Sequence, residues 1–167
     1  FDIFDDELYF GLSDVHGVGS SDYSNFINKV QDAESTFIPR ADWTSIDFIT
    51  MVDASSTAMN NTIRAGLLNH LDIPRKRLLS DYAIWRRLTI GERTRLRKRR
   101  WDSIESILLF LISEYSQKNG ERAKTRVDKL NSELHLFHNP PKFLEDTKQD
   151  INKYEIDMLG YPITYSN

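Results

Sequence analysis

The stretch LSDVHGVGSSDYSNFI, residues 12–27, has the pattern of a helix-hairpin-helix and decides the predicted fold. Apolar residues three and four positions apart mark a helix face on each side of it. Between the two faces, a Gly-Val-Gly sequence permits a tight turn that larger side chains would obstruct. One of the two serines that follow can cap the second helix. We therefore predict two short helices, over 12–15 and 21–30, joined by a two-glycine turn.

The predicted turn has the chemistry of a phosphate-binding site. Backbone N–H groups at such a turn, with a helix N-terminus behind them, can hold a phosphate oxygen. The contact touches no base edge, so it binds nucleic acid without reading sequence. Its candidate residues are Gly17, Val18, Gly19, Ser20 and Ser21. The alternative is a plain connection between helices, because short glycine motifs also occur without a ligand.

Hydrophobic periodicity predicts a mainly α-helical chain, with one short strand over 8–10. After the hairpin, helices are expected over 44–52 with Thr44 as cap, 55–68, 75–88, 103–116, 121–137 and 153–159. The segment 89–91 is expected to interrupt the chain between two of them. The predicted division is 1–72 as a tandem helix-hairpin-helix with a degenerate second hairpin, 73–138 as a basic helical region, and 139–167 as a linker towards a following domain.

Composition sets broad limits on the class of protein. The chain has 167 residues, of which 40% are apolar and 28% charged, as in ordinary soluble proteins. The longest apolar run, Ile107–Ile112, is too short to cross a bilayer. The absence of cysteine excludes disulfides and thiolate metal sites, and it favours a reducing compartment. We therefore expect a cytoplasmic protein that makes no contact with a membrane.

Charge is unevenly distributed, although the net charge is only −3. Residues 1–72 contain 12 acidic and 3 basic side chains, whereas residues 73–100 contain 2 acidic and 11 basic ones. On one continuous helix, Arg93, Arg97 and Arg100 would share a face, and such crowding destabilises a helix unless an anion is near. The candidate phosphate contacts are Arg86, Arg87, Arg93, Arg95, Arg97, Lys98, Arg99 and Arg100, flanked by Trp85 and Trp101. A solvated face, or a stretch neutralised by the acidic first third, is the alternative.

The order of three further segments supports the DNA-binding interpretation. ELYFGL at 7–12 leads into the hairpin, and TSIDFI at 44–49 and NNTIRAGLL at 60–68 follow it. This order, over residues 7–90, resembles the bacterial C-family replicative DNA polymerase, the DNA polymerase III alpha subunit. The resemblance implies the tandem helix-hairpin-helix region beyond the fingers, which contacts duplex DNA behind the active site. His16 stands where the family has Lys, and the second hairpin, over 53–57, has no glycine pair; a divergent, phage-encoded relative fits these departures.

A second motif lies before two prolines and resembles the sliding-clamp-binding pentapeptide Q-L-x-L-F of bacterial replication proteins. Its residues are Glu133, Leu134, His135, Leu136 and Phe137. The resemblance implies that the last two fill an apolar pocket on the clamp, where such anchors carry most of the binding energy. Glu133 replaces the family's Gln and cannot donate the amide hydrogen bond. In the alternative, Leu130, Leu134 and Phe137 form an ordinary helix stripe that faces the core.

No catalytic constellation stands out in the sequence. The acidic run over 2–7 is expected to be a surface feature, and the HxxH spacing of His135 and His138 has no third ligand nearby. A P-loop and a Rossmann fingerprint are both absent. The predicted function is therefore a duplex-DNA-binding module of a replicative DNA polymerase, with a tether to the sliding clamp. The parent polymerase would use Mg²⁺, while this segment would bind no cofactor. A protein–protein adaptor whose basic stretch meets an acidic partner, and an RNA-binding module, are the other two candidates.

Overall fold

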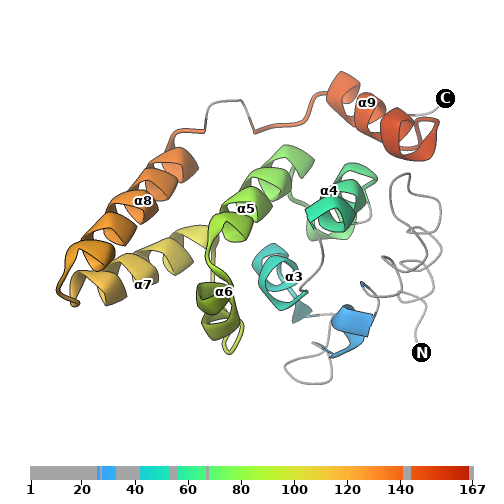
Figure 1. Ribbon diagram of the computed structural model, residues 1–167. Helices are drawn as coiled ribbons and strands as arrows, with labels where there is room; N and C mark the ends of the chain where they lie inside the picture. Colours follow the sequence, from blue (N-terminus) through green and yellow to red (C-terminus); the bar gives the residue numbers. More distant parts are fainter. Residues whose placement is uncertain are drawn as a thin grey trace.

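The structure, a computed structural model, describes residues 26, 28–32, 42–52, 56–66, 68–140 and 144–165. The described part is mainly helical, which confirms the predicted fold class (Figure 1). Residues 28–32 are helical, and the labelled elements that follow are α3 (Ser45–Met51), α4 (Ser56–Arg64), η2 (Asn69–Leu71), α5 (Arg75–Arg87), α6 (Ile90–Leu96), α7 (Ile104–Ser116), α8 (Glu121–His138) and α9 (Lys148–Leu159). The predicted hairpin turn at 17–21 and the predicted strand at 8–10 lie outside the described residues.

Side-chain caps fix where several helices begin. Thr89, Ser103 and Thr147 each accept a hydrogen bond from the backbone N–H three residues later, at the start of α6, α7 and α9. The side chain of that third residue accepts a hydrogen bond from the cap's own N–H, which completes a capping box. Thr44 stands in the same place before α3, where Asp47 accepts from its N–H at 2.8 Å. The predicted starts of α3 and α7 are therefore confirmed.

Two helix boundaries differ from the prediction. α4 ends at Arg64, four residues early, because Gly66 adopts a left-handed conformation with φ of +85° that no helix can continue through. α9 begins at Lys148, five residues early, because Thr147 and Asp150 form a capping box. Both differences come from local backbone and cap chemistry, which periodicity does not register.

The basic stretch does not form one continuous helix. Leu88 and Thr89 are extended, but Ile90 already begins α6, so the predicted interruption at 89–91 is shorter than expected. α6 then ends at Leu96, and residues 97–100 form a turn. Arg97 is the C-cap of α6, and its N–H still donates to the Arg93 carbonyl at 3.0 Å. Arg100 lies beyond the helix end and does not continue the face on which Arg93 lies. The basic stretch is divided between the end of α5, the short α6 and the turn that follows.

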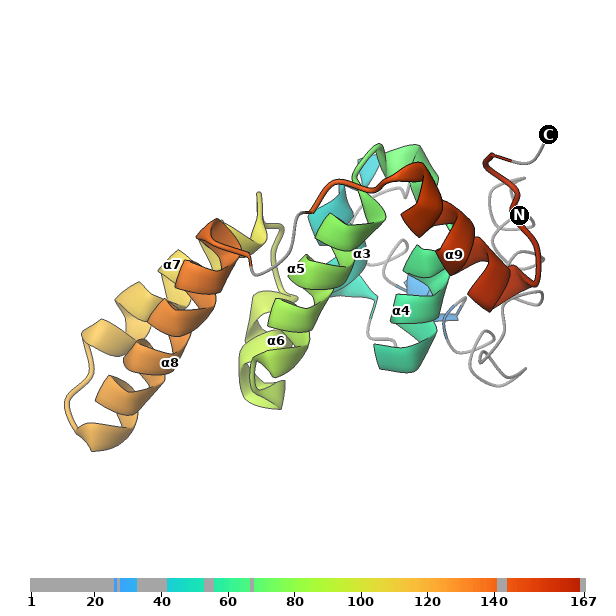
Figure 2. The ribbon, with the colours of Figure 1, turned by 90° about the horizontal axis from the view of Figure 1, so that it is seen from above.

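The apolar residues form two clusters that share α3 and α5. The first gathers residues 26 and 30, one face of α3, and α4 and α5; its fully buried members include Phe26, Val30, Phe48, Met59, Ile63, Leu78 and Tyr82. The second gathers the other face of α3, the end of α5, and α6, α7 and α8; its members include Ile46, Ile49, Ile84, Trp85, Leu96, Ile107, Leu111 and Leu130. Both clusters contain residues from either side of position 72. Figures 1 and 2 show α5 lying between the α7–α8 pair on one side and α4 with α9 on the other.

A buried arginine attaches α9 to the rest of the fold. The Arg75 side chain is 3% exposed and donates to the Glu155 carboxylate at 2.8 Å and to the Arg64 carbonyl at 3.0 Å. Glu155 in turn accepts the backbone N–H groups of Ile163 and Thr164, at 2.8 and 2.9 Å. The segment 139–167, predicted as a linker, therefore contains a helix that the Arg75 guanidinium helps to join to α4 and α5.

Candidate nucleic-acid interface

Three short pieces of chain carry the predicted phosphate contacts. Arg86 and Arg87 lie in the last turn of α5, which ends because Leu88 is extended. Arg93 and Arg95 lie on α6, which begins after the Thr89 cap. The remaining four cations occupy the turn at 97–100 that leads to α7. Because these pieces are close in sequence and α6 is short, the structure keeps the cations in one region, but on different faces.

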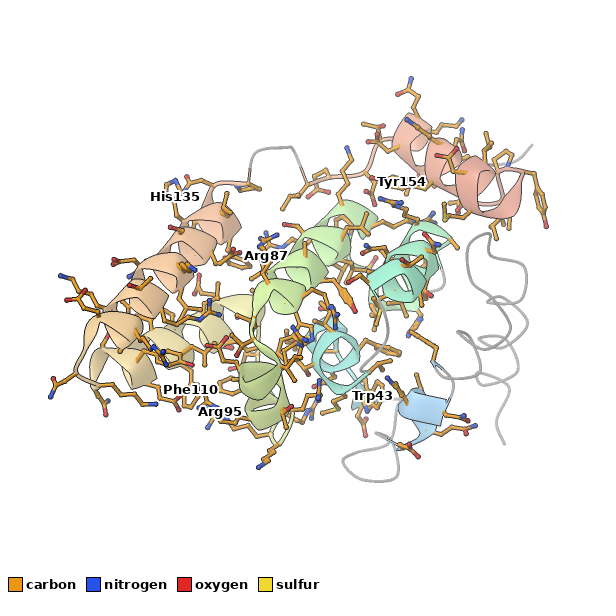
Figure 3. All side chains as sticks on the ribbon, in the orientation of Figure 1. Trp43, Arg87, Arg95, Phe110, His135 and Tyr154 are labelled. Carbon is orange, nitrogen blue, oxygen red and sulfur yellow. The ribbon has the colours of Figure 1, made fainter. Side chains whose placement is uncertain are left out.

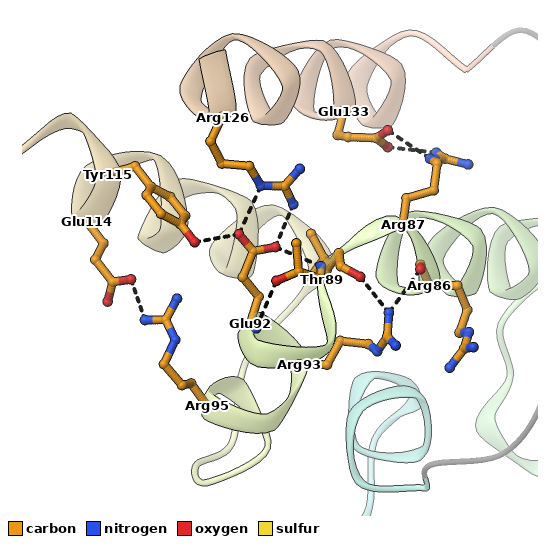
Figure 4. A network of polar contacts seen from close by, with 11 residues as sticks. Arg86, Arg87, Thr89, Glu92, Arg93, Arg95, Glu114, Tyr115, Arg126 and Glu133 are labelled. Carbon is orange, nitrogen blue, oxygen red and sulfur yellow. Dashed lines mark hydrogen bonds and ion pairs between the residues drawn. The ribbon is translucent and has the colours of Figure 1, made fainter. Parts of the chain in front are cut away.

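Three of the arginines form ion pairs with acidic residues of other helices. Arg87 binds the Glu133 carboxylate of α8 with both Nε and Nη2, at 2.8 and 2.7 Å (Figure 4). Arg95 pairs with Glu114 of α7, and Arg100 binds the buried Asp47 carboxylate of α3 at 2.7 Å. The pairs with Glu133 and Glu114 raise the pKa of Arg87 and Arg95 above the usual range. All three cations are thus partly neutralised within the protein, as the neutralisation alternative expects, although only Asp47 comes from the first third.

Arg93 has a structural role at the end of α5. Its side chain is 8% exposed, and Nη1 donates to the carbonyl oxygens of Arg86 and Leu88 at 3.0 and 2.5 Å (Figure 4). These carbonyls belong to the last turn of α5, where a helix leaves acceptors without intrahelical donors. Arg93 therefore caps α5 and offers little surface to an external phosphate.

A buried carboxylate lies in the middle of the basic stretch. Glu92 is 1% exposed, and it accepts the Thr89 N–H at 2.9 Å, the Tyr115 hydroxyl at 2.7 Å and two N–H groups of Arg126 at 2.9 and 2.5 Å (Figure 4). Burial raises the pKa of Glu92, but the hydrogen bonds from Arg126, Thr89 and Tyr115 outweigh it and hold the pKa below its usual range. The capping-box spacing of Thr89 and Glu92 could have signalled this residue. Its partners on α7 and α8 had no sequence signal.

The turn after α6 carries exposed cations. Lys98 is exposed, and its side chain makes no hydrogen bond or ion pair with the residues that the structure describes. Arg99 is also exposed, and its guanidinium lies over the ring of Trp101 at 3.9 Å and near that of Phe110 at 4.7 Å. Arg97 is half-buried, and Arg86 donates to the Ser56 hydroxyl at 3.1 Å. We call Arg99, Trp101 and Phe110 the Arg99 platform.

The predicted clamp-binding residues form the last part of α8. Leu134 and Phe137 are half-buried and pack on the second apolar cluster, as the helix-stripe alternative expects. The Arg77 Cζ atom also lies over the Phe137 ring, 4.1 Å from its centroid, and Arg87 binds the Glu133 carboxylate. Leu136 is 40% exposed, and His135, labelled in Figure 3, is exposed as well. The two predicted anchors, Leu136 and Phe137, therefore face different environments, and an extended peptide would form only if the end of α8 unwound.

We expect alanine substitutions to separate the two interpretations of this motif. Phe137→Ala should lower the free energy of unfolding by about 1–2 kcal/mol, because a half-buried ring loses part of its apolar contact. Leu136→Ala should change it by less than about 0.5 kcal/mol. Urea denaturation of both variants measures these effects. If instead both variants lose little stability and both lose binding to a bacterial sliding clamp, the motif is a clamp-binding peptide.

The remaining predictions concern the two-glycine turn, metal binding and membrane-spanning helices. The five residues from Gly17 to Ser21 lie outside the described ranges. Among the residues described, no group of three or more His, Asp or Glu side chains could hold a metal ion. None of the described helices combines the length and the apolar character needed to span a membrane. Comparison with protein-family models, with curated proteins and with solved structures finds no match to this chain.

Proposed function

We propose that this chain is a nucleic-acid-binding module of a replicative DNA polymerase, which holds duplex DNA by phosphate contacts that do not read sequence. The observation that carries the proposal is the pair of exposed cations in the turn after α6, Lys98 and Arg99, at the end of the segment with 11 basic and 2 acidic residues. Exposed cations on a turn can approach a sugar-phosphate strand without moving a helix. The two-glycine turn at 17–19 would supply a second contact.

The ion pairs limit how much affinity this surface provides. Arg87, Arg95 and Arg100 must share their donors between an internal carboxylate and a phosphate, and Arg93 is buried. Each neutralised phosphate contributes about −0.9 to the slope of log affinity against log salt on duplex DNA. With Lys98 and Arg99 as the main contacts, binding should be weak and the slope small.

The test is the affinity for a blunt DNA duplex measured across a range of salt concentrations. We expect a slope of about −2, and Lys98→Ala should reduce its magnitude by about 0.9. Arg122→Lys is the matched control, because Arg122 is an exposed cation at the start of α8 and the change preserves its charge. A slope near zero, or a slope unchanged in Lys98→Ala, would exclude these cations as phosphate contacts.

The proposal also assigns partners and a compartment. The remaining domains of the polymerase and the sliding clamp would be protein partners, and the Mg²⁺-dependent nucleotidyl transfer would belong to the parent enzyme. The module would work in the bacterial cytoplasm or nucleoid, encoded by the host or by a phage. These assignments depend on the resemblance to the C-family polymerase over residues 7–90.

A protein–protein adaptor is the second candidate, and exposed apolar side chains favour it. Ile90 is 75% exposed at the start of α6, and Leu109 is 49% exposed on α7. Large apolar side chains next to cations are typical of a surface that binds an acidic protein. Competition distinguishes the candidates: a double-stranded RNA that displaces DNA fully would indicate an RNA-binding module, and binding to neither would favour the adaptor.

A further inference from the structure

The Arg99 platform has a geometry that phosphate binding alone does not require. The Trp101 indole N–H donates to the Leu96 carbonyl at 2.8 Å, which fixes the ring at the end of α6. Its ring centroid lies 5.0 Å from that of Phe110, with the ring planes inclined at 56°. The Arg99 guanidinium lies over this aromatic pair, and Phe110, labelled in Figure 3, is 36% exposed. The planar guanidinium group of Arg99 therefore lies on two aromatic side chains at the protein surface.

The side-chain contacts of Arg99 differ from those of the neighbouring arginines. Arg93 caps α5, and Arg95 and Arg100 bind carboxylates. For the Arg99 side chain the structure records contacts with two rings and no hydrogen bond or ion pair among the described residues. The Arg99 Cζ atom lies 3.9 Å from the centroid of the Trp101 ring, while the side chain as a whole is exposed. Part of the guanidinium group is thus accessible to a ligand.

We infer that the Arg99 platform stacks an unpaired base, so that a duplex with a single-stranded extension binds more tightly than a blunt duplex. Guanidinium planes and aromatic rings are the surfaces on which unpaired bases stack, and every base offers such a face. A base inside a duplex has both faces covered by its neighbours, so only an unpaired or terminal base can reach Arg99. Lys98, next in the chain, is placed to bind the adjoining phosphate. The inference rests on the proposed function, because it specifies the nucleic acid that the same surface binds.

The experiment compares three probes by fluorescence anisotropy: a blunt duplex, the same duplex with a thymidine overhang, and the same duplex with a uridine overhang. For the wild-type protein we expect the overhang to increase affinity at least about five-fold, the lower end of what one stacked base contributes. The two overhangs distinguish DNA from RNA as the source of the unpaired base. A change in Trp101 emission on binding reports that the ligand reaches the Arg99 platform, since Trp43 and Trp85 are buried.

Arg99→Lys is the decisive variant, because it keeps the charge and removes the planar group. It should abolish the overhang advantage while leaving the affinity for the blunt duplex within about two-fold of wild type. Arg122→Lys is again the matched control and should retain the advantage. If Arg99→Lys binds all three probes as the wild type does, the stacking inference is overturned and the proposed phosphate binding stands. If the wild type binds no probe, both are overturned.

Discussion

Replacing Arg75 with methionine is expected to lower the free energy of unfolding by about 3–5 kcal/mol, since it removes one partner of a buried ion pair. Methionine has a similar length and cannot donate, so Glu155 would remain buried at 2% side-chain exposure with a charge opposed only by hydrogen bonds from Ile163 and Thr164. The Arg64 carbonyl and the Asn69 side chain would lose a donor as well. Denaturant unfolding followed by circular dichroism measures the loss.

The same substitution should release the C-terminal part of the described chain. α9 contacts α4, and Arg75 supplies the buried ion pair between α9 and the start of α5. Limited proteolysis should therefore cut Arg75→Met within α9 much faster than wild type. The control is Lys76→Met, which removes the half-exposed pair between Lys76, the next residue of α5, and Asp150 of α9, and should cost far less stability because solvent screens that pair. Comparable losses in the two variants would show that the Arg75 network does not hold α9.

Replacing Glu92 with alanine should lower the free energy of unfolding by about 3–4 kcal/mol near pH 7. The change leaves Arg126, which is 20% exposed, without its carboxylate, and it removes the acceptor of the Tyr115 hydroxyl and of the Thr89 N–H. Glu92→Gln keeps the shape and one acceptor oxygen, so we expect it to lose about half as much. Thermal and urea denaturation of the two variants at one pH give this comparison.

The sign of the pH dependence provides a second readout for Glu92. Its pKa is lowered in the folded state, so its charged form stabilises the fold above the ordinary glutamate pKa of about 4.3. That stability is lost as the pH falls through the folded-state pKa. The difference between wild type and Glu92→Gln should therefore shrink as the pH is lowered below about 4. A difference that stays constant from neutral to acid pH would show that the carboxylate charge contributes nothing.

The helices could be predicted from the sequence because their signals are local. Ile46 and Ile49 of α3 and the apolar face of α7 follow a helical period, while Phe48 lies on the other buried face of α3. The caps Thr44 and Ser103 stand directly before those periods, so both starts were predicted correctly. The early end of α4 was missed because it depends on the left-handed backbone of Gly66, and one glycine in a helical pattern does not decide its own conformation.

The roles of the arginines could not be predicted, because their partners are distant in sequence. Arg87 is separated from Glu133 by 46 positions, and Arg100 from Asp47 by 53. A run of basic residues has the same sequence appearance whether its charges face solvent, a phosphate or the protein's own carboxylates. Only the packing of α3, α7 and α8 around α6 decides which arginine is used internally. Arg99 was predicted as one cation among eight, and the aromatic rings beneath it distinguish it from the rest.

The sharp bend after α4 links two positions that are nine residues apart. At Gly66 an added Cβ atom would lie 2.5 Å from the Arg75 Nη2 atom, and the bend is left-handed, so any larger residue would meet both a clash and an unfavourable conformation. Evolution can therefore accept a side chain at position 66 only together with the loss of the arginine. In homologues of this chain, we expect glycine and arginine at these two positions to be retained or replaced as a pair.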